Sequence, residues 1–244
     1  MMKITCIIPL LWIFLSLPSF SIAQSSTDIQ NNHPSSYLSD LKKELVKEWP
    51  KNRAINLVFH GHSVPAGHFK TPVVNTLEAY PYLLLKELKQ RYPTAVINII
   101  NTSIGGEHSG KGEMRFAEEV LPHRPDVLYI DYALNDIRQG LAASKTAWVK
   151  MIEAAQEAGT KVVLLTPSPN LRFDILAEDH ELSKHAQQVR ELAKSFSVGL
   201  VDSYRLFQQK AQAGVDLTDF MSQGNHPNER GHALIAKGLM KLFE

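Results

Sequence analysis

Short apolar runs alternate with longer amphipathic stretches along most of this chain. The short runs are rich in valine and isoleucine and are continuous rather than alternating, which is typical of parallel strands buried on both faces. They occupy residues 55–59, 95–100, 127–133, 161–166 and 198–202. Apolar residues at helical spacing predict helices over residues 36–49, 77–92, 145–159, 180–196 and 229–243. This alternation predicts an α/β fold, a flavodoxin-like three-layer α/β/α sandwich with about five parallel strands flanked by helices.

The first 23 residues have a different character. Lys3, an apolar core and a small-residue ending at Ala23 form the pattern of a secretory signal peptide. The core contains two prolines and is short for a bilayer span of about 20 residues, so we expect cleavage and no stable membrane anchor. Residues 24–36 are polar and unpatterned and predict a flexible leader, which leaves residues 37–244 as one folded domain. The protein is therefore expected to be secreted or periplasmic.

Composition narrows the classes of function. The only cysteine, Cys6, lies in the predicted signal peptide, so the mature chain has no thiol for a disulfide or a metal site. Removal of residues 1–23 deletes one lysine and no acid, which leaves 25 of the 26 basic side chains against 25 acidic ones. This neutral balance argues against binding to nucleic acid or to an anionic membrane. We expect a monomer without a cofactor.

Candidate catalytic side chains follow the predicted strands, because ligands of such sheets bind outside the carboxyl ends of the strands. Ser63 follows the first strand in FHGHSVPAG, on a tight turn where a neighbouring base makes a serine nucleophilic. His226 stands in a turn-forming setting before the closing helix and is a candidate base. Gly106 and Asn135 follow the second and third strands and offer a backbone N–H and a side-chain amide to the same crevice. Each residue alone also has an ordinary explanation as a turn or capping residue.

Taken together, these residues resemble the motifs of the SGNH hydrolases, also called the GDSL esterase/lipase family. The four blocks appear in the family's order as GHS, NTSIGGEHS, ALND and QGNHPNERGH. The resemblance covers nearly the whole mature chain. The resemblance implies that Ser63 is the nucleophile and His226 the general base. It also implies that Gly106 and Asn135 are oxyanion donors.

Three motif blocks each depart from the family pattern at one place. His62 replaces the aspartate of the first block, and Ala133-Leu134 replace the glycine usual before the third-block Asn-Asp. Gln223 replaces the aspartate three residues before the histidine, and an amide fixes a tautomer but does not stabilise an imidazolium as a carboxylate does. Two possible His226 orienters remain besides Gln223. One is a backbone carbonyl, which would give a Ser-His dyad. The other is Asp219, which would need an unusual loop to reach the ring, so we favour the dyad.

The resemblance implies an esterase that hydrolyses carboxylic esters through an acyl-enzyme. Export, a neutral surface and the absence of a long apolar insertion favour small acyl groups, such as acetyl groups on an extracellular polysaccharide. A lipase or a thioesterase of the same fold remains an alternative. Candidates for substrate contact are the loop residues Glu107, His108, Arg172 and Phe173.

Two other functions are compatible with the residues. His60 and His62 share one face of an extended segment, and with His68 or His108 they would form the site of a metal-dependent hydrolase. The chain is shorter than a comfortable eight-stranded barrel of about 250 residues, where such a motif is expected, so we predict no metal site. Gln223 also fits a catalytically weakened glycan-binding protein, although decay is not expected to spare all four catalytic candidates.

Overall fold

A computed structural model describes residues 1–2 and 34–244 of the chain. The predicted cleavage site and most of the predicted leader lie outside these residues, so both remain predictions. Helix α1 (Pro34–Tyr37) begins inside the stretch that was expected to form the leader, two residues before the predicted first helix. No helix within the described ranges combines the length and the apolar character needed to cross a bilayer.

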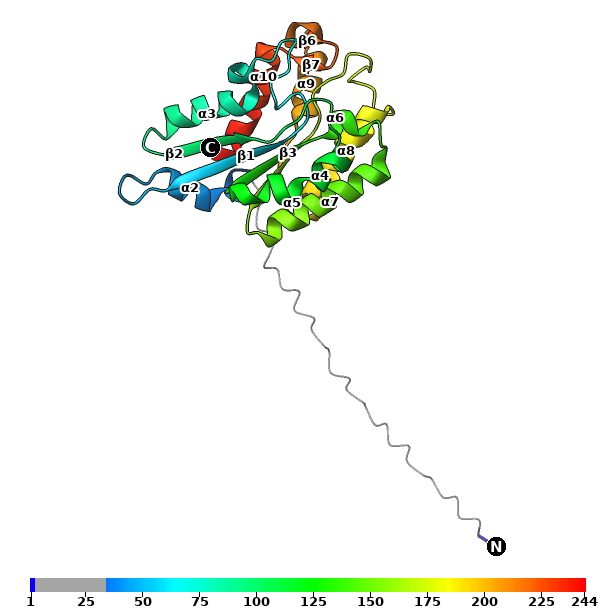
Figure 1. The fold of residues 1–244 in the computed structure, drawn as a ribbon. Coiled ribbons are helices and arrows are strands. Elements are labelled where there is room, and N and C mark those ends of the chain that lie inside the picture. Colours follow the sequence, from blue (N-terminus) through cyan, green and yellow to red (C-terminus); the bar gives the residue numbers. More distant parts are fainter. Residues whose placement is uncertain (3–33) are drawn as a thin grey trace. The chain divides into compact units, whose positions relative to one another are not determined.

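Within residues 34–244, one parallel sheet contains the five strands expected from the apolar runs (Figure 1). The strands are β1 (Ala54–Gly61), β2 (Val96–Asn101), β3 (Val127–Asp131), β4 (Lys161–Leu165) and β5 (Gly199–Val201). Their order is β2-β1-β3-β4-β5, which is the flavodoxin-like order, and every neighbouring pair is parallel. The predicted fold class is confirmed.

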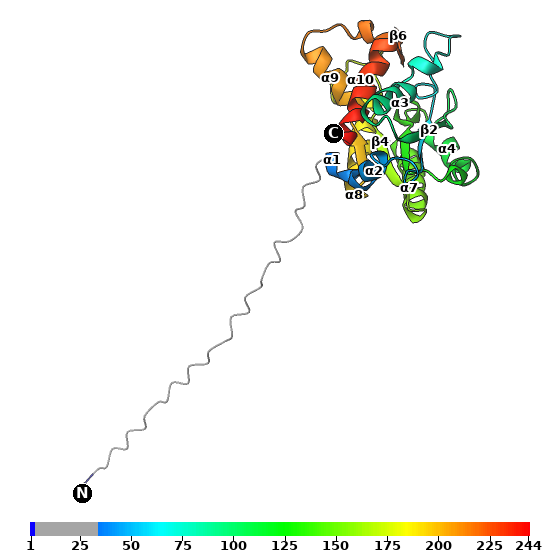
Figure 2. The same ribbon diagram turned by 90° about the vertical axis from the view of Figure 1, so that its left-hand side faces the viewer.

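Helices cover both faces of the sheet because its strands are apolar on both sides (Figures 1 and 2). In β3, Val127 and Tyr129 belong to one core cluster, whereas Leu128 and Ile130 belong to another. The first core is closed mainly by α2 (Ser39–Leu45), α3 (Tyr80–Arg91), α9 (Ser203–Gln212) and α10 (Glu229–Met240). The second is closed mainly by α5 (Phe116–Glu119), α7 (Leu141–Glu157) and α8 (Glu181–Ser195). These are the outer layers of the sandwich.

Several short elements were not expected from periodicity. They are α4 (Ser109–Met114), α6 (Ala133–Asp136), the antiparallel strands β6 (Met221–Gln223) and β7 (His226–Pro227), and single 3-10 turns at 76–78, 121–123, 217–220 and 241–243. Helix α9 was also missed. It begins where the fifth strand was expected to end, because the Asp202 carboxylate accepts a hydrogen bond from the Arg205 N–H and caps the helix.

Candidate active site

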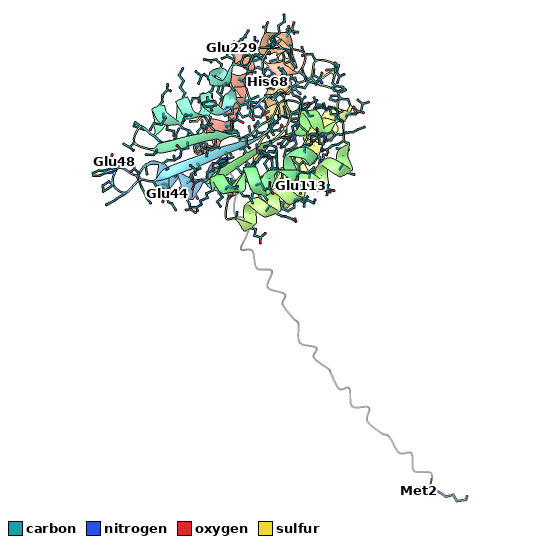
Figure 3. The ribbon with its side chains drawn as sticks, in the orientation of Figure 1. Met2, Glu44, Glu48, His68, Glu113 and Glu229 are labelled. Carbon is teal, nitrogen blue, oxygen red and sulfur yellow. The ribbon has the colours of Figure 1, made fainter. Side chains whose placement is uncertain are left out.

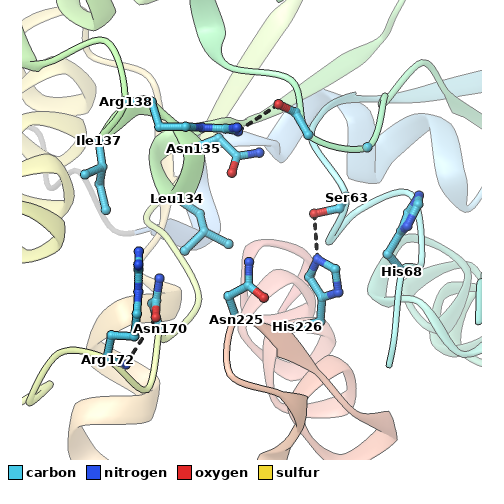
Figure 4. Close-up of a pocket in the computed structure, with 12 residues that line it drawn as sticks. Ser63, His68, Leu134, Asn135, Ile137, Arg138, Asn170, Arg172, Asn225 and His226 are labelled. Carbon is cyan, nitrogen blue, oxygen red and sulfur yellow. Dashed lines mark hydrogen bonds between the residues drawn. The ribbon is translucent and has the colours of Figure 1, made fainter. Parts of the chain in front are cut away.

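Ser63 lies in the turn directly after β1. The turn is closed by a hydrogen bond from the His68 N–H to the Ser63 carbonyl (2.9 Å), and Gly67 has a φ of +87°, which favours glycine. Residues 62–66 form turns rather than an α-helix, so Ser63 does not cap a helix. Its side chain is 6% exposed, and Oγ lies 3.0 Å from Nε2 of His226 (Figure 4). The first and last sequence blocks therefore meet, as the resemblance implies.

His226 is presented by the β6–β7 hairpin, which is followed by α10. Asn228 caps that helix by accepting hydrogen bonds from the backbone N–H groups of Arg230 and Gly231. The ring nitrogen Nδ1 lies 2.8 Å from the carbonyl oxygen of Phe69. Because a carbonyl only accepts, this contact requires a proton on Nδ1 and leaves Nε2 as an acceptor for the Ser63 hydroxyl. The Phe69 carbonyl thus favours the tautomer of His226 whose Nε2 is able to accept the Ser63 proton.

Gln223 also contacts Nδ1 of His226, but from its amide nitrogen, at 2.8 Å. Its Oε1 accepts hydrogen bonds from the N–H (3.1 Å) and the hydroxyl (3.3 Å) of Thr71, which turns the nitrogen toward the ring. An amide nitrogen donates, so Gln223 favours the tautomer that is unable to accept the Ser63 proton. Phe69 and Gln223 therefore have opposite effects on the same nitrogen.

Asp219 does not reach the histidine. Its side chain is 55% exposed, and its carboxylate lies 3.6 Å from Arg230 on α10. Its backbone carbonyl accepts a hydrogen bond from the Asn228 side chain. The loop that would fold Asp219 back onto His226 is not formed, so the orienting contact observed in its place is the backbone carbonyl of Phe69.

The surroundings of His226 favour its neutral form. Burial lowers the pKa of His226, and the nearby imidazoles of His62 and His68 lower it further, while the Phe69 carbonyl opposes this shift. A lowered pKa keeps Nε2 unprotonated to a lower pH than in an ordinary histidine, whose pKa is about 6.5.

The loop after β2 brings Gly106 to the same pocket as Ser63. Residues 104–107 form a turn closed by the Glu107 N–H and the Ile104 carbonyl, and Gly106 within it has a φ of +77°. Among residues 34–244, the N–H groups of Ser63 and Gly106 donate to no backbone carbonyl. Both are thus available to a ligand oxygen.

Two side chains from α6 and the residues just after it hold this loop. The Asn135 amide nitrogen donates to the Glu107 carbonyl (2.9 Å), and Arg138 Nη2 donates to the Gly106 carbonyl (2.7 Å). An amide nitrogen carries two protons, so Asn135 retains one for the pocket. The role of Arg138 was not expected, because a bond to a backbone carbonyl has no sequence signature.

Glu107 is not a substrate contact. Its side chain is buried, and it binds Arg115 through three N–O contacts of 2.6 to 3.2 Å and the Tyr132 hydroxyl at 2.8 Å. Burial alone raises the pKa of Glu107, but the bonds from Arg115 and Tyr132 outweigh it and leave the pKa below the ordinary value. The carboxylate therefore anchors the loop that carries Gly106.

The histidines considered as metal ligands point in different directions. His60 bonds to Thr102 and to the Gly112 carbonyl, and burial lowers its pKa to about 4. His62 faces Asp131 instead, at 3.4 Å. Within the described part of the chain, no three histidine, cysteine or acidic side chains converge as a metal site would require.

Ser63, Gly106, Asn135 and His226 line one pocket of about 460 Å³ (Figure 4). His68 also lines it, and Figure 3 places His68 at one end of the domain and Glu44 and Glu48 at the other. Of the other expected substrate contacts, Arg172 lines the pocket, whereas His108 and Phe173 do not. The pocket lies outside the carboxyl ends of β1, β2 and β3, where the fold predicts a ligand site.

Comparisons with known proteins agree with this arrangement. The sequence profile of the GDSL-like Lipase/Acylhydrolase family matches residues 59–234. A protein of Bacillus subtilis (strain 168), "Uncharacterized lipoprotein YqeF", is 23% identical over 176 residues, which are 59% of this chain and 72% of that protein.

Solved structures with the same fold include several esterases. Axe2, an acetylxylan esterase from Geobacillus stearothermophilus, has a TM-score of 0.68 at 17% identity, over 81% of this chain and 95% of its own. Catalytic mutants of Axe2 alter a serine, a histidine and an aspartate three positions before that histidine. A two-domain esterase active on acetylated mannans has a TM-score of 0.70 at 18% identity, over 85% of this chain and 52% of its own. A putative GDSL-like lipase from Parabacteroides merdae has a TM-score of 0.66 at 20% identity, over 78% of this chain and 95% of its own.

The contact between Gln223 and His226 gives a prediction about pH. Gln223→Glu places a carboxylate beside Nδ1, which stabilises the imidazolium and raises the pKa of His226. The acid limb of the kcat/KM profile for any hydrolysed ester is therefore expected to move to higher pH than in the wild type. Asp219→Asn is the control and is expected to leave the limb in place, because Asp219 faces Arg230. An unshifted limb in Gln223→Glu would mean that residue 223 is not coupled to the base.

Proposed function

This chain belongs to the GDSL-like lipase/acylhydrolase family and is a carboxylic ester hydrolase, and we propose that it is a secreted serine esterase that removes acetyl or similar small acyl groups from a carbohydrate. The observation that carries the catalytic part of this proposal is the 3.0 Å contact between Ser63 Oγ and His226 Nε2. The Phe69 carbonyl holds the other ring nitrogen, so the pair acts as a dyad.

In the proposed reaction, Nε2 of His226 takes the Ser63 proton as Oγ attacks the ester carbonyl. The tetrahedral intermediate then collapses, and the imidazolium returns the proton to the departing alcohol. A water molecule attacks the acyl-enzyme in the same way, gives its proton to His226 and releases the acid together with free Ser63.

The negative oxygen of each intermediate is proposed to bind the N–H groups of Ser63 and Gly106 and the free amide proton of Asn135. The first two make no backbone hydrogen bond in residues 34–244, and Arg138 and Glu107 fix the loop that carries Gly106. Donors fixed in advance are effective because they need no reorganisation during the reaction. Each such donor is typically worth about 3 to 4 kcal/mol of barrier.

Support for a carbohydrate substrate comes from the pocket and from the similar structures. The pocket wall carries the amides of Asn135, Asn170 and Asn225, which suit a substrate rich in hydroxyl groups. The named substrates of two similar structures are acetylated xylan and acetylated mannan. Export is supported by the N-terminal sequence pattern and by the lipoprotein name of the Bacillus subtilis relative.

An ester panel tests the function directly. The wild type is expected to hydrolyse p-nitrophenyl acetate faster than p-nitrophenyl esters of long acyl chains and to release acetate from acetylated polysaccharide. Ser63→Ala is expected to lose at least about a thousandfold in kcat for all of these substrates, because the described residues that line the pocket include no other serine, threonine or cysteine. Hydrolysis that survives in Ser63→Ala would refute the serine mechanism, and a preference for long chains would refute the acetyl substrate.

The dyad predicts how three substitutions rank. His226→Ala removes the base and is expected to lower kcat by about a thousandfold or more. Gln223→Ala is expected to lower it by less than about tenfold, because the Phe69 carbonyl still fixes the ring. Asp219→Asn, whose carboxylate faces Arg230, serves as the matched surface change and is expected to stay near the wild-type rate. A loss in Gln223→Ala equal to that in His226→Ala would contradict the dyad.

A further inference from the structure

The charged side chains that line the active-site pocket are all cationic. They are Arg138 and Arg172, and no aspartate or glutamate is among the described residues that form the wall. Such a pocket attracts an anion, because low-dielectric walls concentrate the field of like charges. This one-sided charge contrasts with the nearly neutral composition of the whole chain, whose formal net charge is +1.

Neither arginine is neutralised by a neighbour. In the described residues, no carboxylate lies within salt-bridge distance of Arg138 or Arg172. Arg138 uses Nη2 to hold the Gly106 carbonyl, whereas Arg172 only extends over the ring of Phe173, 5.9 Å from its centroid. The Arg172 guanidinium is therefore the donor group that a ligand meets.

The backbone that carries Arg172 is fixed beside the catalytic histidine. The Leu171 N–H donates to the Gly224 carbonyl (2.7 Å), in the turn that precedes His226, and the Arg172 N–H donates to the Asn170 side chain (3.1 Å). Figure 4 shows Arg172 and Asn170 on the wall opposite Ser63. A guanidinium binds a carboxylate through two parallel hydrogen bonds, and the nearby amides add further donors.

We propose that the natural ester is anionic and that Arg172 binds a carboxylate of the substrate while its ester carbonyl lies at Ser63. This inference rests on the proposed esterase function and adds the charge of the substrate to it. The carboxylate belongs either to a uronic acid next to the acylated hydroxyl or to a dicarboxylic acyl group. Both sources present the same group to Arg172.

The test compares matched neutral and anionic esters. O-acetylated polygalacturonate is compared with O-acetylated xylan, and p-nitrophenyl hemisuccinate with p-nitrophenyl acetate. The wild type is expected to have a higher kcat/KM for at least one anionic member, and Arg172→Gln is expected to raise KM for that member by roughly tenfold. Added salt is also expected to raise KM for the anionic ester, because salt screens the charge of an exposed arginine. Arg91→Gln is the control, since Arg91 also lies over a neighbouring ring, that of Tyr92, but on α3.

The outcomes separate this proposal from the esterase function. A preference for the hemisuccinate would place the carboxylate in the acyl group of the substrate. A preference for acetylated polygalacturonate would place it in the sugar that carries the acyl group, and either result supports the proposal. Equal kcat/KM for neutral and anionic esters, or an unchanged KM in Arg172→Gln, overturns it while Ser63-dependent hydrolysis of p-nitrophenyl acetate leaves the function standing. Loss of that Ser63 dependence refutes the function itself.

A second, independent observation concerns the residue before the nucleophile. The His62 side chain is fully buried, and its Nδ1 accepts a hydrogen bond from the Val64 N–H (3.2 Å) and lies 3.4 Å from Ser63 Oγ. Its Nε2 faces Asp131 Oδ1 at 3.4 Å. Asp131 is itself buried, and its other oxygen accepts a hydrogen bond from the Tyr80 hydroxyl. Because Nδ1 accepts the hydrogen bond from the Val64 N–H, the imidazole proton lies on Nε2, which faces the Asp131 carboxylate without a hydrogen bond to any described residue.

We infer that His62 is a positioning residue and that Asp131 acts through it. An aspartate or asparagine side chain commonly accepts a hydrogen bond from the N–H two residues later, and Nδ1 of His62 does the same for Val64. The bond spans Ser63 and fixes the turn that presents its hydroxyl. At position 62 an imidazole nitrogen therefore takes the place of a carboxylate or amide oxygen as the acceptor. The nearby carboxylate, that of Asp131 on β3, lies on the other side of the same ring.

A double-mutant cycle tests this pair. His62→Asn keeps the acceptor and is expected to retain kcat within about tenfold, whereas His62→Leu is expected to lose about a hundredfold without a matching change in KM. His62→Asp places two carboxylates together and is expected to be poorly active, and adding Asp131→Asn is expected to restore activity. Asp202→Asn, which also removes a partly buried carboxylate at a strand end, controls for lost stability in thermal unfolding. Full activity in His62→Leu, or strictly additive effects in the cycle, overturns the inference.

Discussion

Burial of one parallel sheet on both faces is the constraint on which the rest of this structure depends. Helices on both sides leave only the strand ends free for polar side chains, and parallel strands bring all their carboxyl ends to one edge. Ser63, Gly106 and Asn135 are far apart in sequence, yet each follows a strand and each lines the same pocket. The β6–β7 hairpin then adds His226 from the end of the chain. The fold therefore brings these residues to one edge of the sheet, and hydrogen bonds of the loops then set their orientation.

The segment after β1 supplies more of the site than the proposed nucleophile, Ser63. Six residues after Ser63, the Phe69 carbonyl accepts the hydrogen bond that fixes the imidazole of His226. Two residues further, Thr71 holds the Gln223 amide. Hydrogen bonds within the loop, from Phe69 to Val73 and from Val73 to Lys70, keep this backbone in place. The position of Ser63 and the orientation of the His226 ring therefore depend on a single loop.

The sequence allowed prediction of those parts that depend on side-chain type or apolar pattern. The five parallel strands, the main helices and the convergence of Ser63, Gly106, Asn135 and His226 belong to this group. The Phe69 carbonyl was foreseen only as some backbone acceptor, because every residue carries a carbonyl and its direction is set by the loop. The prediction that Glu107 contacts the substrate was wrong because its side chain pairs with Arg115, which lies between α4 and α5. Spacing along the chain does not show that these two residues pair. Helix α9 was missed because its buried face is narrow and polar residues dominate its sequence.

The absence of a carboxylate beside His226 affects the two proton transfers of the proposed reaction in opposite directions. A carboxylate at position 223 would stabilise the imidazolium and strengthen the base, whereas here burial and two neighbouring imidazoles lower the pKa of His226. A weaker base removes the Ser63 proton less readily, but its conjugate acid donates a proton more readily. The hydroxyl of a sugar is a poor leaving group that must be protonated as it departs, and an acetyl carbonyl is open to attack in a pocket that carries fixed N–H donors. In such a reaction, the stronger acid that protonates the departing alcohol offsets the weaker base that removes the Ser63 proton. A histidine held by a backbone carbonyl therefore suits the removal of an acyl group from a sugar hydroxyl.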